Sequence, residues 1–120
     1  MTEKIEKFED LNVWKESMKL SVDVYKAIKN CKDFGFRDQI FRSTVSIPSN
    51  IAEGFERQSN KEFIQFLYIA KASCGELRTQ LYLAIKINTI EKSRGEEFIE
   101  RTRKISSMLF KLIKARKEKF

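Results

Sequence analysis

The sequence predicts an all-α fold, an antiparallel up-down-up-down four-helix bundle that spans residues 1–120 as a single domain. A chain of 120 residues supports one hydrophobic core and is too short for two. Only four glycines and one proline occur, so the residues that separate short strands are largely missing. Apolar residues instead recur at three- and four-residue intervals in four segments. Because the connectors between these segments are short, neighbouring helices are expected to be antiparallel.

The first helix is expected over about residues 11–30, ahead of the break CKDFGF. Its predicted core face consists of apolar residues at helical spacing: Leu11, Trp14, Met18 and Tyr25. A second apolar stripe lies beside that face: Val13, Leu20, Val24 and Ala27. The apolar arc is therefore wider than one bundle needs.

The second helix is expected over about residues 36–53, with Gly54 as a left-handed stop. Pro48 leaves two structures open, a kink near Thr44 or a helix that restarts with Pro48 in its first turn. The predicted core line is Phe36, Ile40, Ile47 and Ile51. A second apolar set faces nearly the opposite way: Phe41, Val45 and Ala52.

The third helix is expected over about residues 60–87, because Ser59 and Glu62 have the spacing of a capping box. Its predicted core line is Phe63, Leu67, Ala70, Cys74, Leu77 and Leu81. Further apolar residues occupy its other sides: Ile64, Tyr68, Ile69, Ala72, Tyr82 and Leu83.

The fourth helix is expected over about residues 92–117. Because Gly95 interrupts the pattern there, its first residue is placed only between Thr89 and Glu96. Its predicted core residues are Ile105, Met108, Leu109 and Leu112.

Apolar residues on more than one side of the first three helices predict a homo-oligomer, because one small bundle cannot cover them all. Single apolar residues scattered on a surface are also normal in monomers, so this alternative stays open.

A polar stripe follows the second helix and faces polar residues on the third. The residues expected to form a structural hydrogen-bond network are Gln39, Ser46, Asn50, Glu53, Ser73 and Glu76, with Arg42, Ser43 and Gln80 alongside. A catalytic carboxylate pair of Glu53 with Glu76 is the alternative. The chain has no histidine and no phosphate-loop or dinucleotide motif, so we expect no catalytic residues, no cofactor and no metal site.

The two cysteines, Cys31 and Cys74, are far apart and are interpreted as reduced thiols of a cytoplasmic protein. No apolar run is long enough for a membrane-spanning helix, so a membrane is not an expected partner.

The net charge of +7 is concentrated in the last quarter of the chain, where residues 89–120 carry ten basic and five acidic side chains. The candidate nucleic-acid-binding residues lie on the fourth helix: Arg103, Lys104, Phe110, Lys111, Lys114 and Lys117. An aromatic ring among lysines can track a phosphate backbone and stack on an unpaired base. The same pattern is also typical of a solvated helix face, with Glu100 and Lys104 as an ordinary ion pair.

The segments FEDLNVWKESMKL, residues 8–20, and QIFRSTVSIPSNIAEGFERQSNKEFIQFLYIAKASCGEL, residues 39–77, resemble the 23S rRNA intervening-sequence protein family, also called the four-helix bundle protein family. The family's motif falls on positions that we interpret as architectural: Gln39, Ser46, Asn50, Glu53, Gly54, Arg57, Ser59, Ala70, Ser73, Glu76 and Leu77. The chain departs from the family in its first connector, which lacks a proline, and at Ala72, where members often have glycine.

The resemblance implies an up-down bundle that assembles as a ring-shaped homopentamer with a basic surface and no established enzymatic activity. It also implies similarity to the accessory proteins of diversity-generating retroelements, which bind nucleic acid and a reverse transcriptase. We therefore expect a non-enzymatic homo-oligomer that binds RNA or another nucleic acid. The alternative is a protein-interaction scaffold, or an accessory subunit of a nucleic-acid enzyme such as a reverse transcriptase.

Overall fold

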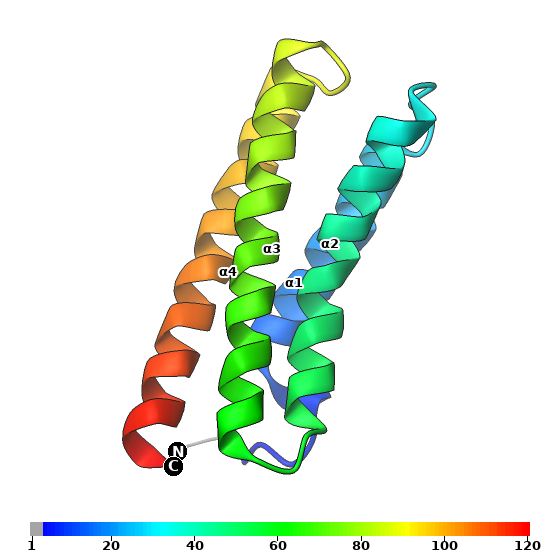
Figure 1. Ribbon diagram of the computed structural model, residues 1–120. Coiled ribbons are helices and arrows are strands. Elements are labelled where there is room, and N and C mark those ends of the chain that lie inside the picture. Colours follow the sequence, from blue (N-terminus) through cyan, green and yellow to red (C-terminus); the bar gives the residue numbers. More distant parts are fainter. Residues whose placement is uncertain (1–3) are drawn as a thin grey trace.

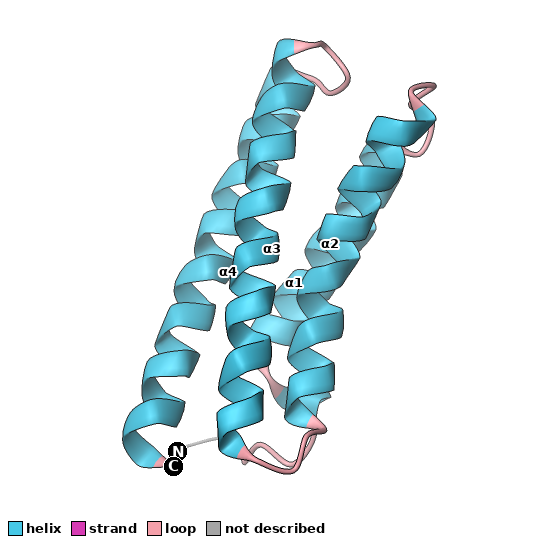
Figure 2. Ribbon diagram, in the orientation of Figure 1, coloured by secondary structure: helices cyan, strands magenta, loops and turns pink. Residues whose placement is uncertain are grey.

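Four long helices and one short 3-10 helix build the chain in a computed structural model that describes residues 4–120. The elements are η1 (Phe8–Asp10), α1 (Asn12–Ile28), α2 (Phe34–Phe55), α3 (Asn60–Lys86) and α4 (Lys92–Lys119). No strand occurs within these residues (Figures 1 and 2). The predicted all-α fold and its four helices are therefore confirmed.

The helices pack side by side in an elongated bundle of 45 × 27 × 19 Å. Consecutive helices along the chain run in opposite directions, and α3 lies between α2 and α4 (Figure 1). Side-chain contacts agree: Ser46 of α2 meets Ser73 of α3, whereas the earlier residue Ser43 meets the later residue Gln80. The helix pairs that touch are α1 with α2, α2 with α3, α3 with α4, and α1 with α4, which closes the bundle.

Local signals set most helix boundaries. The Ser59 hydroxyl accepts a hydrogen bond from the Glu62 amide at 3.1 Å, as the capping pattern predicts. Asp33 caps α2 in the same way, accepting from the Phe36 amide at 3.2 Å, so this helix begins two residues earlier than expected. Asn88, just after α3, has a φ of 61°. It has the left-handed conformation that commonly ends a helix.

The prediction that Gly54 stops the second helix is wrong. No described glycine has a positive φ, and α2 continues through Gly54 to Phe55. A Cβ atom at Gly54 would lie 2.4 Å from Cβ of Phe66, so the missing side chain is what lets α2 and α3 approach. Pro48 is buried inside the same uninterrupted helix, which rules out a restart at that residue.

The core lines predicted for α2, α3 and α4 are largely inside. All six predicted residues of α3 are buried, and in α2 only Phe36 of the predicted four is half-buried. In α4, Ile105 and Leu109 are buried together with Phe98 and Ile113, while Met108 and Leu112 are half-buried.

The predicted core face of the first helix is only half right: Leu11 is buried and Trp14 packs against the core, but the rest of the inner face comes from the second stripe. Val13, Leu20 and Val24 of the second stripe are buried, and Ile28 extends their line. Of the predicted face, Leu11 is buried, but Met18 and Tyr25 are 38% and 55% exposed. The outward-facing part of the predicted face therefore consists of two large side chains, Met18 and Tyr25.

The close approach at Gly54 gives a stability prediction with an internal control. Gly54→Ala should lower the free energy of unfolding by about 1–3 kcal/mol, because its methyl group would overlap Phe66 and helices would have to shift. Gly75→Ala meets no atom within 4 Å in the middle of α3, so it should raise stability by about 0.5–1 kcal/mol. Urea unfolding at one protein concentration measures both, and a Gly54→Ala chain as stable as the wild type would contradict the packing.

Candidate nucleic-acid interface

The seam between α3 and α4 is fixed by polar contacts along its length. Asn60 at the start of α3 bonds to Arg116 near the end of α4. In the middle of the seam, Arg78 donates from Nε to the Thr102 hydroxyl at 3.0 Å. These contacts fix the antiparallel register of the two helices. The residues that point outward along the seam are therefore held in defined positions.

Three aromatic rings are exposed along this seam. Phe110 is 59% exposed, Tyr68 47% and Tyr82 44%. Lys117 donates from Nζ to the Tyr68 hydroxyl at 2.7 Å, and Arg103 donates to the Tyr82 hydroxyl at 2.7 Å. Since Tyr68 and Tyr82 are 14 residues apart on one helix, the row extends for about 21 Å. We call the surface formed by these five residues and Lys114 the α3–α4 face.

A hollow of about 330 Å³ opens on the α3–α4 face between Tyr68 and Phe110. Ile113 forms its floor, and Lys114, Lys117 and Glu118 complete its lining. Neither lysine forms an ion pair with another residue in the range 4–120. The hollow thus combines two aromatic rings with two cations that have no acidic partner there.

The six predicted residues of the fourth helix do not share one face. Phe110, Arg103, Lys114 and Lys117 line the α3 side and the outer side of α4, where the tyrosines meet them. At 100° per residue, Lys104 and Lys111 lie on the flank that leads toward α1, the side on which Arg101 pairs with Asp23. These two lysines are exposed but belong to another surface.

Arg103 differs from the free lysines because it is already paired. Its guanidinium donates to Glu100 and to Tyr82. The hydrogen bond to Glu100 raises the pKa of Arg103 above its usual value. The sequence suggested Glu100 with Lys104 as the ion pair, but the structure pairs Glu100 with Arg103. Arg103 therefore orients Tyr82 more than it adds free positive charge.

Tyr68 and Tyr82 were missed as functional candidates by the sequence, which treated them as surplus apolar residues. Their polar partners are on another helix, 49 and 21 residues away along the chain. The only local signal is their 14-residue spacing, which places both tyrosines on one side of α3.

Hydrogen bonds join α2 and α3 through part of the predicted polar stripe. The hydroxyl groups of Ser46 and Ser73 lie 2.8 Å apart, and Asn50 donates to Ser46 at 2.8 Å. Ser43 donates to the amide oxygen of Gln80. Gln39 and Glu76 instead line a polar hollow of about 310 Å³ on the outside of this contact. Glu53 pairs with Arg57 at 3.3 Å.

The alternative of a catalytic pair formed by Glu53 and Glu76 is wrong. The close approach of Gly54 to Phe66 places Glu53 near residue 67 of α3, so Glu76 lies about 13 Å further along the bundle.

Burial raises the pKa of the Cys74 thiol to about 12, which leaves it protonated at neutral pH. Within residues 4–120, no group of acidic, cysteine or histidine side chains could hold a metal ion. No helix in the same range is long and apolar enough to cross a membrane.

Comparisons with known proteins agree with the resemblance carried by residues 8–20 and 39–77. The family model described as 23S rRNA-intervening sequence protein matches residues 9–111. Among solved structures, the chain is similar to a protein with unknown function from the S23 ribosomal protein family of Bacteroides thetaiotaomicron VPI-5482. The two are 31% identical with a TM-score of 0.79, over 85% of this chain and 98% of that one. No curated protein matches the chain.

The Ser46–Ser73 contact predicts a measurable loss when one hydroxyl is removed. Ser73→Ala should lower the free energy of unfolding by about 1 kcal/mol, the usual net contribution of one hydrogen bond. Thr79→Ala is the control, because Thr79 is exposed and its hydroxyl bonds only to the Gly75 carbonyl of its own helix. Urea unfolding compares the two, and equal stability of both variants would contradict a structural role for the network.

Proposed function

The chain belongs to the 23S rRNA-intervening sequence protein family, and we propose that it is a non-enzymatic homo-oligomer, a pentamer, that binds RNA through the α3–α4 face. The observation that carries this proposal is the hollow between Tyr68 and Phe110, with Lys114 and Lys117 on its rim.

Positive charge supplies the attraction. The chain carries a net charge of +7, and ten of its basic residues lie on α4. Lys114 and Lys117 can neutralise phosphates, and each neutralised phosphate releases a condensed cation. Affinity should therefore decrease steeply as salt increases. Assembly strengthens the effect, because every added copy contributes another +7 to a shared surface.

Exposed rings favour unpaired nucleotides over a duplex. A base in a duplex is already stacked on its neighbours, whereas an unpaired base can stack on Phe110 or Tyr68. Lys114 and Lys117, which line the same hollow, could hold the adjoining phosphates. The α3–α4 face therefore suits a loop or single-stranded segment of RNA.

Two apolar surfaces outside the α3–α4 face support self-association. The first, which we call the α1–α2 face, consists of Met18, Val22, Tyr25, Phe34, Phe41 and Val45. Tyr25 of α1 and Phe41 of α2 stack with ring centroids 5.1 Å apart, which joins the two helices into one surface. Val22, Tyr25, Phe34 and Val45 are each about half exposed in a single chain, so water contacts a contiguous apolar area.

The second apolar surface lies on the outer side of α3 and consists of Ile69, Leu83 and Ile87, which are 47%, 47% and 50% exposed. The polar hollow between α2 and α3 separates it from the α1–α2 face. Two different apolar surfaces on one chain suit head-to-tail contacts, which close into a ring when the rotation between copies permits it. A cyclic assembly is thus favoured over a two-fold dimer, and the family resemblance implies five copies.

Self-association can be tested by placing charge on the α1–α2 face. The wild-type chain should be oligomeric at micromolar concentration in size-exclusion chromatography with light scattering. Tyr25→Glu combined with Val45→Glu should give a folded monomer, because two buried carboxylates without partners oppose assembly. Ser107→Glu adds charge at an exposed position of α4, outside both apolar surfaces, and should leave the assembly unchanged. A monomeric wild-type chain would refute this part of the proposal.

RNA binding can be tested with two charge-matched variants on α4. Lys114→Glu with Lys117→Glu should weaken binding of single-stranded RNA by about tenfold or more at 0.1 M salt, because both phosphate contacts become repulsive. Lys104→Glu with Lys111→Glu makes the same change in net charge on the other flank and should weaken binding less. Fluorescence anisotropy over a salt series, with a single strand and a duplex of equal length, measures both. Equal losses in the two variants would show that overall charge, and not the α3–α4 face, drives binding.

A further inference from the structure

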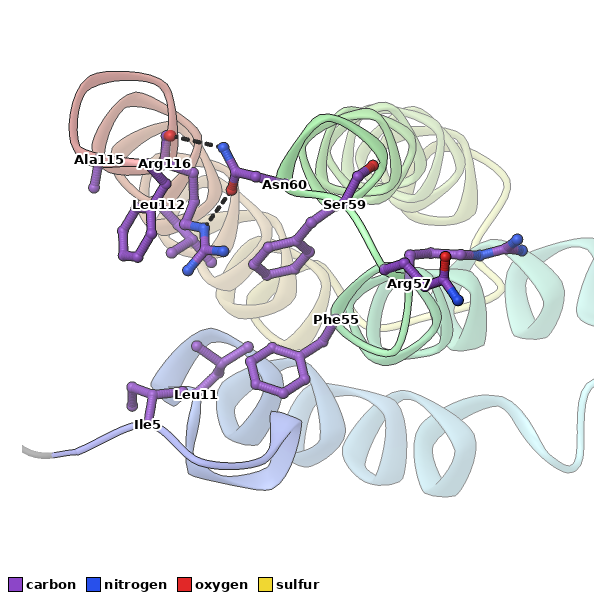
Figure 3. A pocket seen from close by; sticks show the side chains of 12 residues that line it. Ile5, Leu11, Phe55, Arg57, Ser59, Asn60, Leu112, Ala115 and Arg116 are labelled. Atoms are coloured by element: carbon purple, nitrogen blue, oxygen red, sulfur yellow. Dashed lines mark hydrogen bonds between the residues drawn. The ribbon is translucent and has the colours of Figure 1, made fainter.

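A second cavity, of about 490 Å³, opens at the end of the bundle where α2 joins α3 and where α4 ends. Its volume lies in the range of small-molecule binding sites. Figure 3 shows it enclosed by the N-terminal segment, the α2–α3 connection and the last turns of α4. The walls are mainly apolar: Leu11, Phe55, Phe63, Leu112, Ala115 and Phe120.

One cation is fixed within this apolar surface. Arg116 donates from Nε to Oδ1 of Asn60 at 2.7 Å, and Nδ2 of Asn60 donates back to the Arg116 carbonyl at 2.9 Å (Figure 3). The Arg116 guanidinium also lies 5.0 Å from the ring centre of Phe63 and 3.8 Å from that of Phe120. These contacts hold the guanidinium in place while its two terminal nitrogens form no hydrogen bond with residues 4–120.

The Arg116 charge is unbalanced in the described part of the chain. It forms no ion pair there, and partial burial lowers the pKa of Arg116 below its usual value. An arginine nevertheless stays charged at neutral pH. The neighbouring Arg57 does not share this environment, because it pairs with Glu53 and points away from Arg116 (Figure 3). A half-buried cation with free donors is stabilised by an anion that brings two acceptor oxygens.

We propose that this cavity binds a small carboxylic acid with an apolar body, with its carboxylate on Arg116 and its hydrocarbon against Phe55, Phe63 and Leu112. A carboxylate matches the two free nitrogens of the guanidinium in number and geometry. A phosphate group carries more charge than a single arginine balances, and the other arginine of the lining, Arg57, is already paired with Glu53. A neutral apolar molecule would cover the Arg116 charge without pairing it.

The carboxylate site is separate from the α3–α4 face. Arg116 and Leu112 lie on the inner side of α4, whereas Lys114 and Lys117 lie on its outer side. A ligand in this cavity contacts neither Tyr68 nor Phe110. The proposal therefore holds or fails independently of RNA binding.

Calorimetric titration of the full chain with three matched probes tests the proposal: decanoate, decanol and decylamine. Decanoate should bind with one molecule per chain, at least about tenfold more tightly than decanol, because a charge-assisted pair adds to the same apolar contact. Decylamine should bind more weakly than decanol, because its ammonium group meets a cation. No binding of decanoate, or equal affinity for decanoate and decanol, would overturn the proposal.

A charge-matched pair of variants locates the site. Arg116→Met keeps an apolar stem and should reduce decanoate affinity to that of decanol. Lys61→Met removes one exposed positive charge from the same end of the bundle and should leave decanoate affinity unchanged. An equal loss in both variants would overturn the assignment to Arg116. If Arg116→Met does not fold, the NMR chemical shifts of the Asn60 side-chain amide in the wild-type chain test whether the ligand binds beside Arg116. They should shift with decanoate and not with decanol, and unmoved signals would overturn the proposal.

Discussion

The contact between α2 and α3 is the constraint on which the rest of the structure depends. Gly54 lets the two helices approach where any side chain would collide with Phe66. Further toward the start of α2, the Ser46–Ser73 and Ser43–Gln80 hydrogen bonds fix the register of α2 against α3. With this register set, α3 buries one side in the core and can present Tyr68 and Tyr82 toward α4. The lysines of the α3–α4 face lie on α4, which takes no part in the α2–α3 contact. That contact therefore affects the face through the position of α3.

The sequence predicts the fold well because local signals agree with the packing. The Ser59 cap sets the start of α3, and its apolar line from Phe63 to Leu81 has more members than either stripe of the first helix; all six are buried. In the first helix two apolar stripes of equal length lie side by side, and no local signal indicates which of them faces the core. Gly54 has the same ambiguity: a glycine near a helix end can stop the helix or admit a neighbour, and only the position of Phe66 decides.

The candidate site could be predicted only in part, because it combines residues from two helices. The spacing on α4 gives Phe110, Lys114 and Lys117, but it cannot show that Lys117 bonds to Tyr68. It also cannot separate Lys104 and Lys111 from the others until Arg101 and Asp23 show which flank of α4 faces α1. The exposed apolar surfaces of α1 and α3 could not be assigned from the sequence either, because these helices carry apolar residues on more than one side and only the packing shows which are buried.

Photo-crosslinking tests the central claim, that RNA binds on the α3–α4 face, most directly. Ultraviolet light joins an unpaired base to an aromatic side chain that it stacks on, and mass spectrometry of the digested complex identifies the peptide. The account predicts cross-links to Phe110 and Tyr68, which flank the hollow between α3 and α4. Cross-links confined to Tyr25, Phe34 or Phe41 on the α1–α2 face would contradict it.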